Sequence, residues 1–202
     1  MYIFGYNCTM SEVSLRERTR IAVRADISRI AMGMFLDRGF DATTVDQIAE
    51  EVGVSRRSLF RYFASKEEMA AADIALRGEE MLAAFKERPA EESPWESLYA
   101  AAFDSDERGP ANSRERTLLV ARLLRETPAL QRYRLEKQKQ WQELLAPAVA
   151  SRIGGPDSEI AARGIVATAL ACLDASVDIW VENGGKGDVL EVFTRMLGAV
   201  RQ

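Results

Sequence analysis

Residues 44–63 read TVDQIAEEVGVSRRSLFRYF, and their spacing predicts two short helices joined by a tight turn. Ala49 is small enough to let a second helix cross closely, and Gly53 supplies the positive φ that such a turn needs. Ser55 suits the cap of the next helix, and Leu59 follows Ala49 by ten residues and faces back into the same core. Two short helices joined through a glycine turn are typical of the helix-turn-helix that binds DNA.

The second of these helices, near residues 55–62, is expected to enter the major groove through its N-terminal residues. Arg56 and Arg57 are the candidates for reading bases, because a guanidinium can bond both acceptors on the edge of guanine. Serine can bond either bases or phosphate. Phosphate contacts are expected from the basic and hydroxyl-bearing residues Arg61, Tyr62 and Lys66 and from the two threonines at a helix N-terminus. The full predicted DNA-contacting set is Thr43, Thr44, Ser55, Arg56, Arg57, Ser58, Phe60, Arg61, Tyr62 and Lys66.

Charge is distributed unevenly along the chain. The 202 residues carry a formal net charge of −4, which alone would argue against a nucleic-acid partner. Residues 11–66, however, hold ten Lys and Arg against eight Asp and Glu, whereas residues 67–202 hold 17 against 23. A mildly basic N-terminal segment followed by an acidic body is compatible with DNA contact through the N-terminal segment.

Composition excludes several classes of function. The chain has no histidine, which removes Ser-His-Asp and Cys-His catalysis and histidine-based metal sites. Its two cysteines, Cys8 and Cys172, provide neither a disulfide framework nor a metal-ligand spacing, so we expect a cytoplasmic protein without metal or cofactor. No apolar run reaches the roughly 18 residues that span a bilayer. Residues 1–10 lack a basic leader, so we expect no signal peptide and consider Met10 an alternative natural start.

Periodicity and capping signals predict an all-α protein of about nine helices. They are expected near residues 20–38, 44–51, 55–62, 66–87, 94–104, 113–126, 128–152, 158–182 and 188–200. Pro147 is expected to kink or split the seventh of them. We expect an N-terminal tail over residues 1–18, a helix-turn-helix domain over 19–66 and a helical domain over 67–202.

Residues 19–70 resemble the DNA-binding domain of the TetR family of transcription regulators. The resemblance rests on an ordered series of motifs, which are Ile27 to Phe35 as an apolar stripe, Gly39-Phe-Asp-Ala-Thr-Thr44-Val-Asp-Gln-Ile-Ala49, Gly53-Val-Ser55 and Leu59-Phe-Arg-Tyr-Phe-Ala-Ser-Lys66-Glu67. Ile30, Met34 and the pair Arg61-Tyr62 depart from the residues usual in the family, and the pair leaves open which of its members touches phosphate. The resemblance implies operator contacts at the Thr44, recognition-helix and Lys66 positions.

The helical body is expected to bind a small effector and to dimerise. Several of its large side chains are core candidates, but others could enclose an apolar pocket, for which we predict Trp95, Tyr99, Phe103, Leu119, Leu123, Trp141, Leu170 and Asp174. Residues 158–182 are apolar on more than one face and rich in small residues, so with 188–200 they suit a four-helix dimer interface. Residues 118–182 loosely resemble the TetR branch with an acyl-CoA-like ligand-binding domain, which implies an apolar or acyl effector.

These observations together predict a homodimeric repressor that binds a palindromic DNA operator and is released by a small molecule. One alternative is a DNA-binding regulator or architectural protein without a small-molecule switch. A second alternative is an enzyme built on a helical bundle, which the missing histidine and the lack of a glycine-rich phosphate loop make remote. Loss of DNA affinity on ligand binding would separate the switch from the first alternative, and turnover of a ligand would support the second.

Overall fold

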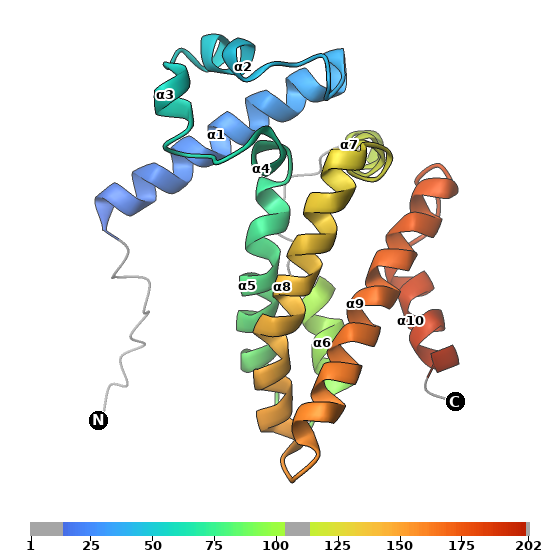
Figure 1. Ribbon diagram of the computed structural model, residues 1–202. Coiled ribbons are helices and arrows are strands. Elements are labelled where there is room, and N and C mark those ends of the chain that lie inside the picture. Colours follow the sequence, from blue (N-terminus) through green and yellow to red (C-terminus); the bar gives the residue numbers. More distant parts are fainter. Residues whose placement is uncertain (1–13, 104–113, 201–202) are drawn as a thin grey trace, which may run out of the picture. The chain divides into compact units, whose positions relative to one another are not determined.

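The computed structural model describes residues 14–103 and 114–200 (Figure 1). Within these ranges the chain forms ten α-helices and no strand, which confirms the predicted all-α class. The chain divides into two compact units, Met1–Met69 and Ala70–Gln202, with the division three residues beyond the predicted boundary at 66 and 67.

The first unit holds α1 (Leu15–Arg38), α2 (Val45–Val52), α3 (Arg56–Leu59) and the start of α4 (Lys66–Ala70). Local capping explains where these helices begin. The Thr44 side chain accepts the N–H of Gln47, and the Gln47 side chain accepts the N–H of Thr44, so both donors at the start of α2 are satisfied. The unit closes around fully buried apolar side chains, which are Ile27, Ala31, Phe35, Ile48, Leu59 and Phe63.

The helix α1 begins five residues earlier than the apolar stripe alone predicts. The Ser14 hydroxyl accepts the N–H of Glu17 at 3.2 Å, which caps a polar N-terminal extension of the helix. The stripe of buried residues starts only at Ile27, so hydrophobic periodicity gives no signal for this first part. Helix therefore occupies part of the predicted tail at 1–18, and Cys8 and Met10 lie outside the described residues.

The second unit is a bundle of longer helices. In chain order they are α5 (Ala72–Glu87), α6 (Pro94–Phe103), α7 (Arg114–Glu126), α8 (Pro128–Ile153), α9 (Ser158–Glu182) and α10 (Val189–Val200). Helix α8 packs along α9, α5 packs against α8 and α6, and α10 packs against α9 (Figure 1). The buried side chains that fill the main core come from α5, α6, α8 and α9 and include Phe85, Leu98, Leu145, Val149, Val166 and Leu170.

Two predicted helices differ from the observed ones. The helix predicted over 66–87 is interrupted at Ala71, whose φ of −114° and ψ of 26° leave the helical region, so α4 and α5 are separate and the total becomes ten. The helix α8 runs through Pro147 as one element, contrary to the split considered as one outcome for this residue.

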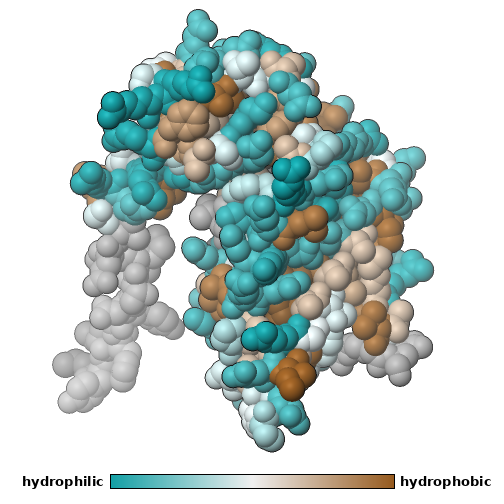
Figure 2. Space-filling view, viewed as in Figure 1, coloured by the Kyte–Doolittle hydropathy of each residue, from teal (hydrophilic) through white to brown (hydrophobic). Residues whose placement is uncertain are grey.

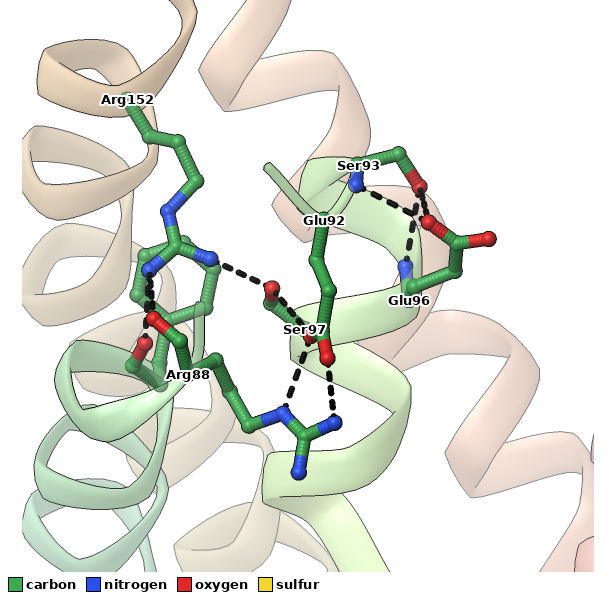
Figure 3. A network of polar contacts seen from close by, with 7 residues as sticks. Arg88, Glu92, Ser93, Glu96, Ser97 and Arg152 are labelled. Atoms are coloured by element: carbon green, nitrogen blue, oxygen red, sulfur yellow. Dashed lines mark hydrogen bonds and ion pairs between the residues drawn. The ribbon is translucent and has the colours of Figure 1, made fainter. Parts of the chain in front are cut away.

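A polar clamp joins the C-terminal ends of α5 and α8 to the start of α6 (Figure 3). The guanidinium of Arg152 donates to the carbonyls of Phe85 at 3.0 Å and Arg88 at 3.1 Å, and to the hydroxyl of Ser97. It also lies 4.3 Å from the centre of the Phe85 ring. Ser97 is fully buried, and its hydroxyl donates to Glu92 at 3.0 Å, so the clamp fixes the turn between α5 and α6.

The helix α9 is the most apolar long element of the second unit. By length and composition it would suffice to cross a membrane, with a mean hydropathy of 1.6 over its 18-residue window, but only 33% of that window is buried within the chain. Such a helix is also found in the cores of soluble proteins. Much of the apolar surface of α9 therefore lies outside the core of this chain.

Candidate nucleic-acid interface

The turn between α2 and α3 has the geometry that the sequence predicts. Gly53 adopts φ 77° and ψ 30°, in the left-handed region that glycine enters without steric cost. The N–H groups of Gly53 and Val54 both reach the carbonyl of Ala49, the latter at 2.9 Å, which closes the end of α2. The Ser55 hydroxyl accepts the N–H of Ser58 at 3.1 Å and thereby starts α3.

The regular part of α3 is short, and hydrogen-bonded turns extend it. The N–H of Phe60 bonds the carbonyl of Arg56 at 3.1 Å, and the N–H of Phe63 bonds the carbonyl of Leu59 at 3.1 Å. Leu59 and Phe63 are buried in the core of the first unit. Since these two residues turn inward, Arg56, Arg57 and Arg61 are left exposed on the outer side of the segment.

Arg56 is exposed but oriented. Its Nη1 lies 2.9 and 3.2 Å from the two carboxylate oxygens of Asp46 on α2, and its guanidinium lies 5.6 Å from the centre of the Phe60 ring. The two side chains of the ion pair are 59% and 66% exposed, so DNA can compete for Arg56 at little cost. Phe60 is itself 43% exposed, which leaves its ring at the surface of the segment.

The remaining side chains predicted to contact DNA from this segment differ in exposure and in the hydrogen bonds that they make within the protein. Arg57 and Arg61 are exposed. The Ser55 and Ser58 hydroxyls lie 3.0 Å apart within the cap of α3, so their first role is structural. Tyr62 is half-buried.

The two threonines predicted to hold phosphate have different environments. Thr44 is exposed at the N-cap of α2, which leaves it in place for a phosphate contact. Thr43 is fully buried, and its hydroxyl donates to the carbonyl of Gly39 at 2.8 Å. The structure therefore corrects the expectation for the Thr43 side chain, which stabilises the turn before α2 and does not face solvent.

The ammonium group of Lys66 is hydrogen-bonded within the protein, which the sequence does not reveal. Its Nζ donates to the carbonyls of Phe40 at 2.7 Å and Thr43 at 3.0 Å, and it lies 4.1 Å from the centre of the Phe40 ring. These contacts hold the turn that carries the N-terminus of α2. Lys66 thus positions Thr44, whatever further contact its ammonium makes.

Arg24 is a positioning residue that the sequence reasoning missed. Its guanidinium lies 4.3 Å from the centre of the Phe63 ring, donates to the carbonyl of Tyr62 and pairs with Glu68 at 2.9 Å. Glu68 also accepts the N–H of Ala64 at 2.6 Å. The contacts join α1 to the segment after α3 across about 40 residues of sequence, a separation over which no periodicity gives a signal.

Comparison with known protein families identifies both halves of the chain. Residues 27–72 match the model of the bacterial regulatory proteins of the tetR family, and residues 92–202 match that of the MftR C-terminal domain. The chain belongs to the TetR family. TetR proteins are DNA-binding transcription regulators, so the helix-turn-helix and the function class predicted from residues 44–63 are confirmed.

The relatives are themselves transcription regulators. The HTH-type transcriptional regulator TcmR of Streptomyces glaucescens is 36% identical over 159 residues, which cover 76% of this chain and 70% of TcmR. The putative mycofactocin biosynthesis transcriptional regulator MftR of Mycobacterium tuberculosis is 29% identical over 82% of this chain and 83% of MftR. The solved structure of FadR from Bacillus subtilis with stearoyl-CoA has the same fold, with a TM-score of 0.54 and 22% identity over 86% of this chain and 95% of FadR.

In the second unit of this TetR protein, the predicted aromatic ligand contacts are mostly packing residues. Trp95 is half-buried between the two hydrophobic clusters of the unit. Tyr99 stacks on Phe193 with ring centres 5.6 Å apart, and its hydroxyl lies 3.2 Å from that of Thr194. The backbone of Phe103 ends α6, and its side chain lies outside the described residues.

The three predicted leucines differ in burial. Leu170 is buried in the main core, and Leu123 is half-buried on α7. Leu119 is 45% exposed on α7, so its side chain is not part of the buried core.

Asp174 is the predicted body residue with the most informative surroundings. Its Oδ1 accepts from Arg134 and lies 3.2 Å from Nη2 of Arg125, while Asp178, one turn further along α9, accepts from Arg125. The sequence analysis did not single out Arg125, Arg134 or Asp178, because the contacts that join them to α9 or α7 span 40 to 53 residues of chain. The structure turns both arginines inward, with side chains only 14% and 17% exposed.

Proposed function

We propose that this protein is a homodimeric repressor that binds a palindromic operator and releases it when a small, mainly apolar effector binds the second unit. The observation that supports DNA binding most directly is the buried anchoring of Leu59 and Phe63, which leaves Arg56, Arg57 and Arg61 exposed beside a capped turn. Guanidinium groups at the start of a recognition helix are suited to the guanine edge, and Arg61 is suited to phosphate.

The proposed dimer interface is the outer face of α9 and α10. An open groove of about 590 Å³ on this face is lined almost entirely by small and apolar residues, which are Ala167, Thr168, Ala171, Cys172, Ala175, Met196, Ala199 and Val200. The alanines of α9 recur every four residues and so form one smooth strip. Figure 2 shows tan and brown residues interrupting the hydrophilic surface where Figure 1 draws α9.

Pairing of two such faces explains the composition of α9. A helix that is apolar beyond its buried side is suited to a second partner, which would remove the remaining apolar face from water. A second copy supplies the partner by two-fold symmetry, and the same symmetry places two recognition helices on two half-sites of a palindrome. Four helices, two from each subunit, would then bury the strip.

The effector proposal rests on the second unit as a whole. Its match to the MftR C-terminal domain places it among regulator domains, and the FadR of the same fold was solved with stearoyl-CoA. For release to occur, the effector must bind more tightly to the form of the repressor that cannot bind DNA. The effector and the DNA then lower each other's affinity for the protein by the same factor. DNA in excess should therefore weaken effector binding by the same factor.

Fluorescence anisotropy with DNA flanking the gene, over a series of salt concentrations, tests the central part of the proposal. We expect saturable binding whose affinity falls steeply with salt, because phosphate contacts release counterions. The double variant Arg56→Ala, Arg57→Ala should lose specific binding, whereas Arg122→Ala, Arg132→Ala removes the same charge from exposed positions of the body and should not. If the protein binds neither this DNA nor any sequence selected from the whole genome, the proposal that it regulates transcription by binding DNA is refuted.

Sedimentation velocity tests the interface. Ala171→Glu places a carboxylate in the α9 groove and should convert dimer to monomer, while Ala83→Glu makes the same change at an exposed position of α5 outside the proposed interface. A dimer that survives Ala171→Glu unchanged would show that the two copies pair through another surface.

A further inference from the structure

Two polar side chains occupy the inward-facing stripe of α8. Leu130, Leu145 and Val149 on this helix are fully buried. Arg134 and Trp141 lie on the same stripe, since they precede Leu145 by eleven and four residues, spacings that return to one face of a helix. A core-facing stripe normally continues with apolar residues, so these two positions require an explanation.

Arg134 shares its carboxylate partner with a second arginine. Arg125 and Arg134 direct their guanidinium groups at the same oxygen, Oδ1 of Asp174. The second carboxylate, Asp178, pairs with Arg125 and is 45% exposed. Burial, reinforced by the positive charge of Arg125 and opposed by Asp178, lowers the pKa of Arg134. Arg134 therefore shares one carboxylate oxygen with Arg125, while the second carboxylate of the cluster pairs with Arg125 and is half in solvent.

Arg134 also has a donor that the protein does not use. Its Nε–H is buried and has no acceptor among the described residues. Buried N–H groups without an acceptor are rare in folded proteins because the lost hydration is not compensated. An anionic oxygen is the acceptor best suited to this guanidinium N–H, because hydrogen bonds between ionised groups are the strong ones.

Trp141 has the same deficit at the other end of the stripe. Its Nε1–H is buried without an acceptor in the described part of the chain. The indole packs on α5 at Gly78, where an added Cβ would lie 2.2 Å from Cδ1 and 2.7 Å from Nε1 of the ring. Only glycine leaves room for this contact, so a movement of the indole would change the packing of α8 against α5.

We propose that the face of α8 between Arg134 and Trp141 binds the effector, and that the effector is an elongated, mainly apolar molecule with an anionic oxygen held by Arg134. This inference rests on the proposed function and specifies its ligand. The two residues are seven apart, so their Cα atoms are separated by about 10 Å along the helix. The apolar chain of the ligand extends along α8 to the Trp141 indole and turns it away from Gly78, which loosens the contact of α8 with α5.

Dodecanoate, an apolar chain with a carboxylate, and dodecanol, the same chain without the charge, are the probes. The full-length protein is labelled with 5-fluorotryptophan, and its three tryptophan signals are followed by ¹⁹F NMR, with Trp141 assigned as the signal lost in Trp141→Phe. We expect dodecanoate to shift the Trp141 signal saturably and to bind at least tenfold more tightly than dodecanol. Arg134→Met should abolish this preference, and Arg134→Lys, which keeps the charge but not the Nε–H, should reduce it.

Matched controls separate recognition from general damage. Arg132→Met removes a charge at an exposed position of α8 and should leave the preference for dodecanoate intact. Gly78→Ala should move the Trp141 signal without ligand, whereas Gly164→Ala, where an added Cβ meets nothing within 4 Å, should not. Circular dichroism confirms that each variant is folded.

Three results would overturn the inference. These are equal affinity for the two probes, an unchanged preference in both Arg134 variants, and no saturable binding of dodecanoate up to its solubility limit. Operator binding without ligand, measured by anisotropy on the same variants, keeps the two proposals distinguishable. Retained DNA binding together with any of these results would refute the ligand class and the site alone, whereas lost DNA binding in the unaltered protein would refute the proposed function.

Discussion

Replacement of Arg56 by alanine gives the sharpest test of the recognition surface. In the free protein Arg56 bonds Asp46 at 2.9 Å, but the pair is 59% and 66% exposed and so contributes at most about 1 kcal/mol. A bidentate contact with guanine discriminates by about 1–3 kcal/mol. With the guanine contact taken at the middle of its range, about 2 kcal/mol, and the ion pair at about 0–1 kcal/mol, the net loss in Arg56→Ala is about 1–2 kcal/mol for each half-site. For a dimer on a palindrome the loss doubles to about 2–4 kcal/mol, or roughly 30- to 1,000-fold in Kd.

Anisotropy titrations with the operator and with a scrambled duplex measure this loss. Arg56→Ala should weaken binding to the operator by the stated factor and change binding to the scrambled duplex little. Arg132→Ala serves as the control for loss of one positive charge from each subunit, and Asp46→Asn frees Arg56 and should tighten binding. The reasoning is refuted if Arg56→Ala weakens both duplexes equally and lowers the salt slope by about 0.9 for each phosphate that is no longer neutralised, because Arg56 would then bind the DNA backbone and not a base.

Three further results are expected. Gly53→Ala should destabilise the first unit by about 1–2 kcal/mol, because φ is 77° and no side chain crowds the added Cβ; amide hydrogen exchange of α2 measures this, and Gly53→Asn should be milder. Arg152→Met leaves the Phe85 carbonyl and the Ser97 hydroxyl without their charged donor and should cost about 3 kcal/mol in urea unfolding of the second unit, whereas an unchanged midpoint would contradict the clamp. Burial raises the pKa of the Cys172 thiol above its ordinary value of 9.0. Iodoacetamide at pH 8 should therefore label Cys172 more slowly in the folded protein than in the urea-unfolded protein, as followed on the peptide that contains it. Because the folded state favours the neutral thiol, the stability that this preference gives the fold is present below pH 9.0 and is lost as pH rises through the folded pKa. Equal labelling rates of Cys172 in the two states would argue against its burial.

Much of the helical architecture could be predicted from the sequence because helix boundaries are set by neighbouring residues. Thr44 and Gln47 form their capping box within one turn, and Gly53 and Ser55 define the bend between α2 and α3 by their own backbone and side-chain chemistry. The predicted helices after residue 90 therefore agree with the observed ones to within about one residue at their ends. The ordered motifs over residues 19–70 also sufficed to indicate the TetR family, which the family comparisons confirm.

The roles of individual polar side chains were decided by tertiary packing. Lys66 reads as a phosphate contact, yet its ammonium binds carbonyls 23 and 26 residues away. Nothing in the sequence distinguishes Arg125 and Arg134 from the other arginines of the body, yet the approach of α7 and α8 to α9 buries them against Asp174, 40 to 49 residues away. Capping and periodicity act within one or two turns of chain and can be read from the sequence by itself. Which charged groups meet in the interior depends on how whole helices cross, and only the tertiary structure determines that.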